Sequence, residues 1–161
     1  MAKELLNPGF NANFTFSNEK GIKMDVVGYA ALFNQVSILA LFQEFGFVLT
    51  QAVERKTPIA MAALRGSIDA FKYLVPFESE ENIHLLLRWL CKLDRSEFVD
   101  VLMQLHRTSV DSLLINNEDQ ILQVACRFGA LKVAQLLVDK YKFSVSKSDV
   151  SIKKGDFCFL N

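Results

Sequence analysis

Apolar residues recur at helical spacing in short segments that turn-forming or polar residues separate. The clearest segment begins at Thr57-Pro58, an N-cap residue followed by proline at the first helical position, where its missing N–H and fixed φ suit the first turn. Gly66 interrupts the apolar run, Ser67 is expected to cap again, and apolar residues recur over 68–75. Two consecutive helices are therefore predicted here.

The same pattern recurs along the chain. Matching copies lie 32 residues before and 63 residues after the clearest one, and a degenerate copy lies between, with Leu85-Leu86 in place of Thr57-Pro58. The predicted units cover approximately residues 25–50, 57–77, 82–106 and 120–145, with a partial unit at 3–13. The residues at the position of Gly66 in the other copies are Asn34, Asp94 and Gly129. Because one helix pair is too small to bury its own apolar faces, the units are expected to stack into a solenoid.

The segment from Thr57 to Val75 resembles an ankyrin repeat, whose pattern is T-P-L-H-x-A-A-x-x-G-H followed by V-V-x-L-L-L. Ile59 replaces the first leucine and Ala60 replaces the histidine. The resemblance implies an all-α fold, an ankyrin-repeat α-solenoid of about four helix pairs that forms one domain over residues 1–161. It also implies β-hairpin or loop fingers, which we expect at 14–23 and 51–56.

The overall composition excludes several classes of protein. Hydrophobic residues make up 51% of the chain and charged residues 22%, which excludes intrinsic disorder. Lys plus Arg equals Asp plus Glu at 18 each, so no basic excess favours nucleic acid. The apolar stretch from Gly28 to Leu49 contains Asn34, Gln35 and Glu44, which argues against a membrane span and for two short helices that separate near Asn34.

Three cysteines and a start without a signal-peptide pattern indicate a reducing, cytoplasmic location. We expect a monomer. The divergent repeats and 14 phenylalanines also resemble ankyrin proteins that intracellular bacteria deliver into host cells, which would place the chain in the host-cell cytoplasm.

A search for catalytic chemistry finds little in the sequence. It contains no C-x-x-C, no glycine-rich phosphate loop, no H-E-x-x-H and no calcium loop. His84 and Cys91 are seven residues apart, which on a helix is roughly 10 Å along the axis, too far for a nucleophile and its base to form a hydrogen bond. Cys91 and Cys126 occupy the position of a small repeat residue and are expected to be buried. We predict no catalytic residue, metal or cofactor.

The repeat register predicts a binding surface. In the ankyrin family, the fingers and the exposed residues of the first helices line a concave face that binds other proteins. The two residues before each turn residue give eight candidates on this face, Leu32, Phe33, Leu64, Arg65, Lys92, Leu93, Arg127 and Phe128, and the second finger adds Arg55 and Lys56. Five of the eight are large and apolar. They form either a hydrophobic groove for a partner or, if the divergent repeats twist, additional core.

The leading hypothesis is a non-enzymatic module that binds a partner protein or peptide. One alternative is a targeting or substrate-recruiting segment of a larger enzyme or secreted effector. A second alternative is a cysteine-dependent enzyme.

Overall fold

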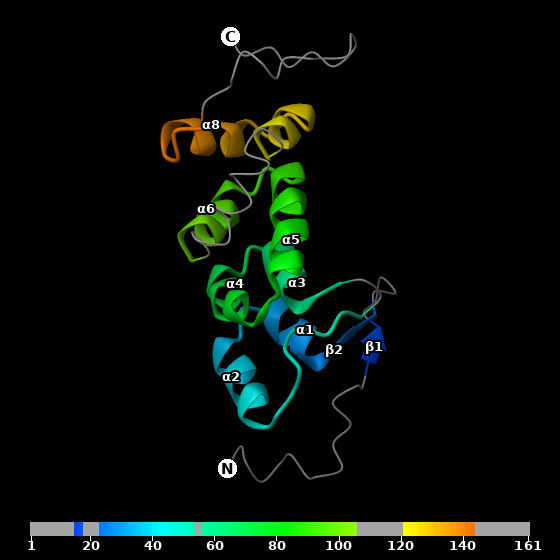
Figure 1. Cartoon of the computed structure of the whole chain (residues 1–161). Coiled ribbons are helices and arrows are strands. Elements are labelled where there is room, and N and C mark those ends of the chain that lie inside the picture. The colour runs from blue at the N-terminus through cyan, green and yellow to red at the C-terminus, as the bar shows by residue number, and fades with distance from the viewer. Residues whose placement is uncertain (1–14, 18–22, 54–55, 106–120, 144–161) are drawn as a thin grey trace. The chain divides into compact units, whose positions relative to one another are not determined.

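The computed structural model describes residues 15–17, 23–53, 56–105 and 121–143, and these residues are mostly helical (Figure 1). The backbone divides into two compact units, Met1–Phe77 and Glu78–Asn161. Within the described residues, no helix has both the length and the apolar character needed to cross a membrane.

The first unit contains a short hairpin and two helix pairs. Strands β1 and β2 pair antiparallel, with Phe16 opposite Met24. In order, the elements are β1 (Thr15–Ser17), β2 (Lys23–Asp25), α1 (Val26–Leu32), α2 (Val36–Glu44), α3 (Pro58–Arg65), α4 (Ile68–Leu74) and the 3-10 turn η2 (Val75–Phe77). Helix α1 packs against α3, the first helix of the next pair, and α2 packs against α4. Equivalent helices are therefore neighbours, as a stack of repeats requires.

The second unit contains two more helix pairs. Its helices are α5 (Glu80–Lys92), α6 (Ser96–Leu105), the helical residues 121–127 and α8 (Leu131–Asp139). Helix α5 packs against α6, and α6 packs against α8. The contact between α6 and α8 again joins the second helices of consecutive pairs.

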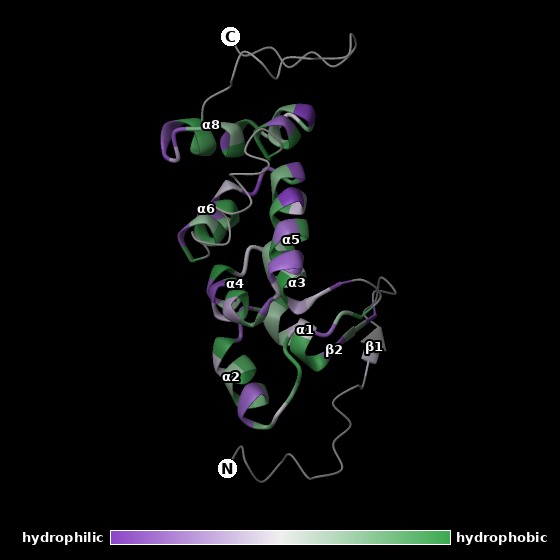
Figure 2. Cartoon of the chain, viewed as in Figure 1, coloured by the Kyte–Doolittle hydropathy of each residue, from purple (hydrophilic) through white to green (hydrophobic). Residues whose placement is uncertain are grey.

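Small side chains allow the close packing of α1 against α3. Ala31, Ala62 and Ala63 are completely buried, and Ala30 is nearly so. Larger residues of the second helices, including Leu39 and Phe71, complete the core of this unit. The described α-helices other than α1 carry hydrophilic as well as hydrophobic residues (Figure 2).

Three helices begin at residues whose side chains accept a hydrogen bond from the first turn. The acceptor and donor pairs are Asp25 with the N–H of Gly28 (2.7 Å), Thr57 with the N–H of Ala60 (3.3 Å) and Ser79 with the N–H of Asn82 (3.3 Å). Such a cap contributes about 1 kcal/mol to helix stability. The prediction that α3 begins after Thr57, with Pro58 in its first turn, is confirmed.

In every described helix pair, a residue with left-handed backbone geometry follows the first helix within two residues. The φ angles are +58° at Asn34, +91° at Gly66, +52° at Asp94 and +66° at Gly129. These are the four positions that the repeat register aligns. Glycine adopts this conformation without strain, and Asn and Asp are the non-glycine residues that tolerate it best. The expected break near Asn34 is also confirmed, because α1 ends at Leu32 and α2 begins at Val36.

Three local expectations are wrong. Ser67 precedes α4, but its side chain makes no capping bond there and instead donates from Oγ to the carbonyl of Leu32 at 2.8 Å. Helix α5 begins at Glu80, so Leu85-Leu86 lies inside a helix rather than at its start. The buried apolar residues of α5 recur at helical spacing from Ile83 to Cys91, and the side chain of Ser79 caps the start of the helix. The third correction concerns Cys126, which is half-buried.

The two fingers that the sequence predicts lie partly within the described residues. The first, at 14–23, overlaps the hairpin formed by β1 and β2. In the second, at 51–56, Val53 and Lys56 form an isolated antiparallel bridge.

Candidate functional site

The exposed residues at the end of α1 and α3 form a cluster that we call the first patch, namely Phe33, Leu64 and Arg65. Phe33 is 44% exposed and Leu64 is 50% exposed. The Cζ atom of Arg65 lies 5.9 Å from the centre of the Phe33 ring, within the range of a cation–π interaction. Tyr29, one helical turn before Phe33, places its ring centre 4.7 Å from that of Phe33. An aromatic surface and a guanidinium group are thus presented together.

Hydrogen bonds between the two helix pairs fix the position of the first patch. The Oδ1 atom of Asn34 accepts from the N–H of Ala70 at 2.8 Å, and its Nδ2 donates to Asp69 at 3.1 Å. Together with the bond from Ser67 to Leu32, they hold the turn after α1 against the start of α4. The side chains on this turn are presented by a rigid scaffold rather than by a loose loop.

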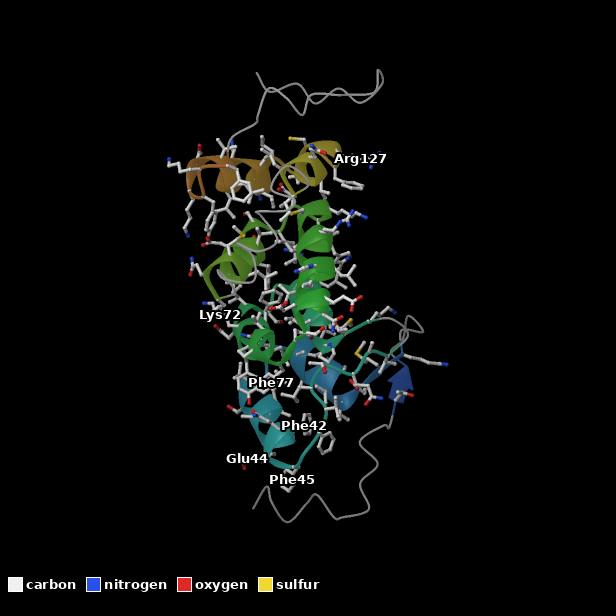
Figure 3. The ribbon with its side chains drawn as sticks, in the orientation of Figure 1. Phe42, Glu44, Phe45, Lys72, Phe77 and Arg127 are labelled. Carbon is white, nitrogen blue, oxygen red and sulfur yellow. The ribbon has the colours of Figure 1, made fainter. Side chains whose placement is uncertain are left out.

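The equivalent residues of the second unit form the second patch, namely Lys92, Leu93, Arg127 and Phe128. Leu93 is 41% exposed and Phe128 is 49% exposed. The Nζ atom of Lys92 lies 4.9 Å from the centre of the Phe128 ring. Arg127 is exposed at the end of the helix formed by residues 121–127 (Figure 3). The first patch and the second patch therefore share an exposed aromatic ring with a cation from the neighbouring helix pair beside it.

A hydrogen bond across the second unit is equivalent to that of Asn34. The Oδ1 atom of Asp94 accepts from the N–H of Val133 at 3.0 Å, in the first turn of α8. Ala130, the residue before α8, has no side-chain acceptor of its own. The turn that carries Leu93 is thereby fixed to the helix pair that carries Phe128.

The structure places seven of the eight predicted concave-face residues at exposed positions, and Leu32 is half-buried. Phe33, Leu64, Leu93 and Phe128 do not belong to the core, so the alternative that divergent repeats bury them is wrong. Lys56 is half-buried and takes part in the bridge with Val53, while Arg55 lies outside the described residues. Whether the two patches form one groove stays a prediction.

Sequence reasoning overlooked Tyr29 and Leu85, whereas Arg88 was expected only as a basic residue beside the predicted surface. Tyr29 extends the first patch, and its position four residues before Phe33 on the same helix was the available signal. Leu85 and Arg88 are exposed on α5, seven and four residues before Lys92, and therefore lie on one face with it. A helical-face analysis of 80–92 would have found Leu85 and its alignment with Arg88 and Lys92.

A second group of aromatic residues lies on the second helices of the first unit and the segments that follow them (Figure 3). Phe42 and Phe47 stack with ring centres 4.9 Å apart, and Tyr73 and Phe77 are 5.7 Å apart. Phe42, Phe47 and Tyr73 are half-buried. Their contacts with one another account for this group as packing.

The cysteines do not form an evident reactive site. Cys91 is completely buried, and its burial, together with the nearby charge of Asp94, raises the pKa of its thiol to about 12. A thiolate is the reactive form of cysteine, so this environment opposes nucleophilic chemistry at Cys91. His84, on the same helix, is half-buried, whereas His106 and Cys158 lie outside the described residues. Across the described residues, no cluster of three His, Cys, Asp or Glu side chains has the arrangement of a metal site.

No family model, no curated protein and no solved structure matches this chain.

Proposed function

We propose that the chain is an ankyrin-type repeat module that binds a partner protein or peptide and has no catalytic activity of its own. The repeat assignment is supported by four helix pairs, each with a left-handed residue between its helices, and by contacts between equivalent helices within each unit. The hairpin before α1 corresponds to a finger.

The observation that carries the binding function is the equivalence of Phe33 and Phe128. Both residues directly precede the left-handed residue of their helix pair, both are nearly half exposed, and both have a cation of the adjacent pair near the ring. Single exposed apolar residues are common on protein surfaces, but here an exposed leucine accompanies each ring. Clustered aromatic, aliphatic and guanidinium groups are typical of the central residues of protein interfaces.

The same surfaces would serve a recruiting segment of a larger enzyme or of a secreted effector, because recruitment also requires binding of a partner. The two roles differ in what lies beyond the module and not in how the module binds. The buried, high-pKa thiol of Cys91 gives no support to the cysteine-dependent enzyme.

Affinity capture with quantitative mass spectrometry tests the proposal. The bait proteins are the wild-type chain, a variant with Leu64→Glu and Phe128→Glu, and a control with Ile38→Glu and Val138→Glu. The control residues are similarly exposed but lie on α2 and α8, away from the ends of the first helices. We expect that the wild type and the control capture a shared set of proteins and that the patch variant does not capture them. Equal capture by all three baits would contradict the proposed surfaces.

A further inference from the structure

The second patch extends along α5 as a strip of exposed cationic and apolar residues. Leu85, Arg88 and Lys92 follow one another at intervals of three and four residues, so they lie on one face of the helix, and all three are exposed. The contact of Lys92 with Phe128 joins this strip to the next helix. Arg127, the residue directly before Phe128 in the sequence, adds a third cation.

The positive charge of this surface is not neutralised within the described residues. Arg88, Lys92 and Arg127 make no ion pair with any residue that the structure describes, in contrast to Arg95 with Glu97 and Lys140 with Asp100. The carboxylate nearest in sequence to Lys92 belongs to Asp94, and one of its oxygens already caps α8. The chain as a whole has as many acidic as basic residues, so these three cations are not part of a general basic excess.

The arrangement on α5 costs the free chain stability. Two like charges four residues apart on a helix destabilise it by roughly 0.2–0.5 kcal/mol. The exposed apolar side chains of Leu85, Leu93 and Phe128 add surface that water solvates poorly. An occupant with negative charges and large apolar groups would relieve both costs.

We propose that the second patch binds an acidic segment of a partner protein, with carboxylates that pair with its three cations and a large apolar side chain against Leu93 and Phe128. This inference rests on the proposed binding function and specifies the chemistry of the partner. A peptide fits this surface better than a nucleic acid does, because the exposed side chains of Leu85 and Leu93 neither pair with phosphates nor stack with bases. Guanidinium and ammonium groups at the edge of an apolar contact fix the orientation of such a segment.

Selection from a displayed library of random peptides of about 12 residues tests the chemistry directly. The full chain is the target, and the Lys92→Glu, Arg127→Glu variant is used for counter-selection. A second variant, Lys72→Glu with Lys132→Glu, makes the same change in net charge at exposed lysines of α4 and α8. Circular dichroism and thermal unfolding confirm that each variant folds. Selected peptides are then titrated, with a single-stranded oligonucleotide as a second polyanion.

We expect the enriched peptides to combine Asp or Glu with Leu, Ile, Phe or Trp. Their dissociation constants should rise at least about tenfold in the Lys92→Glu, Arg127→Glu variant and change less than about twofold in the control. Enriched peptides that are neutral or basic would overturn the acidic preference and leave the binding function standing. Equal binding of the oligonucleotide would overturn the choice of a peptide. Selection of no peptide that distinguishes wild type from variant would overturn this use of the second patch, whereas the proposed function fails separately in the capture experiment.

Discussion

The carboxylate of Asp94 accepts a hydrogen bond from the backbone N–H of Val133, 39 residues later, and so caps α8 of the following helix pair. Asn34 makes the same bond to Ala70 in the first unit. In both cases the acceptor has a left-handed backbone and the donor is the third residue of the second helix of the next pair. One residue thus ends its own helix and satisfies an orphan N–H of another.

Substitution of Asp94 tests this dual role. Asp94→Asn keeps an oxygen acceptor and tolerance of a positive φ, so its unfolding free energy should stay within about 0.5 kcal/mol of wild type. Asp94→Ala loses the cap and gains backbone strain, which together cost about 2 kcal/mol. Asp94→Gly loses only the cap and should lie between the two. Urea unfolding measures the free energies.

Hydrogen exchange provides the positional control for the same variants. Loss of protection in Asp94→Ala should be greatest over 131–139, because the lost bond lies in the first turn of α8. An equal loss of protection over the first unit and α8 would contradict the capping role of Asp94. An alanine variant as stable as the asparagine variant would contradict it too.

The carboxylate of Glu78 gives the stability of the fold a dependence on pH. Glu78 is buried, its Oε1 has no hydrogen-bond partner among the described residues, and burial raises its pKa above the ordinary value despite the hydrogen bond from Asn82. A raised carboxyl pKa favours the folded state at low pH, and this contribution is lost as the pH rises through the raised value. The unfolding free energy of Glu78→Gln relative to that of wild type should therefore increase as the pH is raised from acid to neutral. Urea unfolding at each pH measures this difference.

Asp100 supplies the matched control with the opposite trend. Partial burial alone would raise the pKa of Asp100, but hydrogen bonds from Lys140 and Tyr141 and the charge of Lys140 outweigh it and lower the pKa. Its contribution is present above the ordinary pKa of an aspartate and is lost as the pH falls through the lowered value. Asp100→Asn should lose stability relative to wild type at neutral pH and converge with it in acid. Parallel pH trends for the two variants would contradict these environments.

Thiol labelling distinguishes the two described cysteines. Because Cys91 is completely buried with a pKa near 12, a maleimide should modify it in the folded chain at least about a hundredfold more slowly than in urea. Cys126 is half-buried and should react faster than Cys91. Peptide mapping by mass spectrometry measures each site separately. Rapid modification of Cys91 under native conditions would revive the cysteine-dependent enzyme.

The local signals for helix pairs were readable from the sequence. Thr57-Pro58 and Gly66 act within one or two helical turns, and the four turn residues share a register that a one-dimensional comparison detects. The acceptor roles of Asn34 and Asp94 were not predictable, because their donors lie on the next helix pair. The same limit applies to Ser67, whose hydroxyl donates to the carbonyl of Leu32 instead of capping its own helix.

The candidate surface could be predicted only in part, because it too depends on contacts between residues that are distant in the sequence. Register placed Phe33 and Phe128 correctly before the turn, but only the structure gives their exposure and the cations beside them. The repeat register of the degenerate unit was wrong at Leu85-Leu86, because this unit has no Thr-Pro signal and its apolar residues begin at Ile83, closer to the start of α5. Of the two predicted finger residues, Arg55 lies outside the described residues.

The affinity of one captured and purified partner for three forms of the chain, measured by calorimetric titration, tests most directly whether the exposed residues of the two patches bind it. Leu64→Glu with Phe128→Glu should raise the dissociation constant at least about tenfold, because each change places a charge in an apolar contact. Its melting temperature should stay within about 3 °C of wild type, since both side chains are about half exposed. The Ile38→Glu, Val138→Glu control should bind like wild type. Undiminished binding by the patch variant, with the control unchanged, would contradict the central claim that these exposed residues hold the partner.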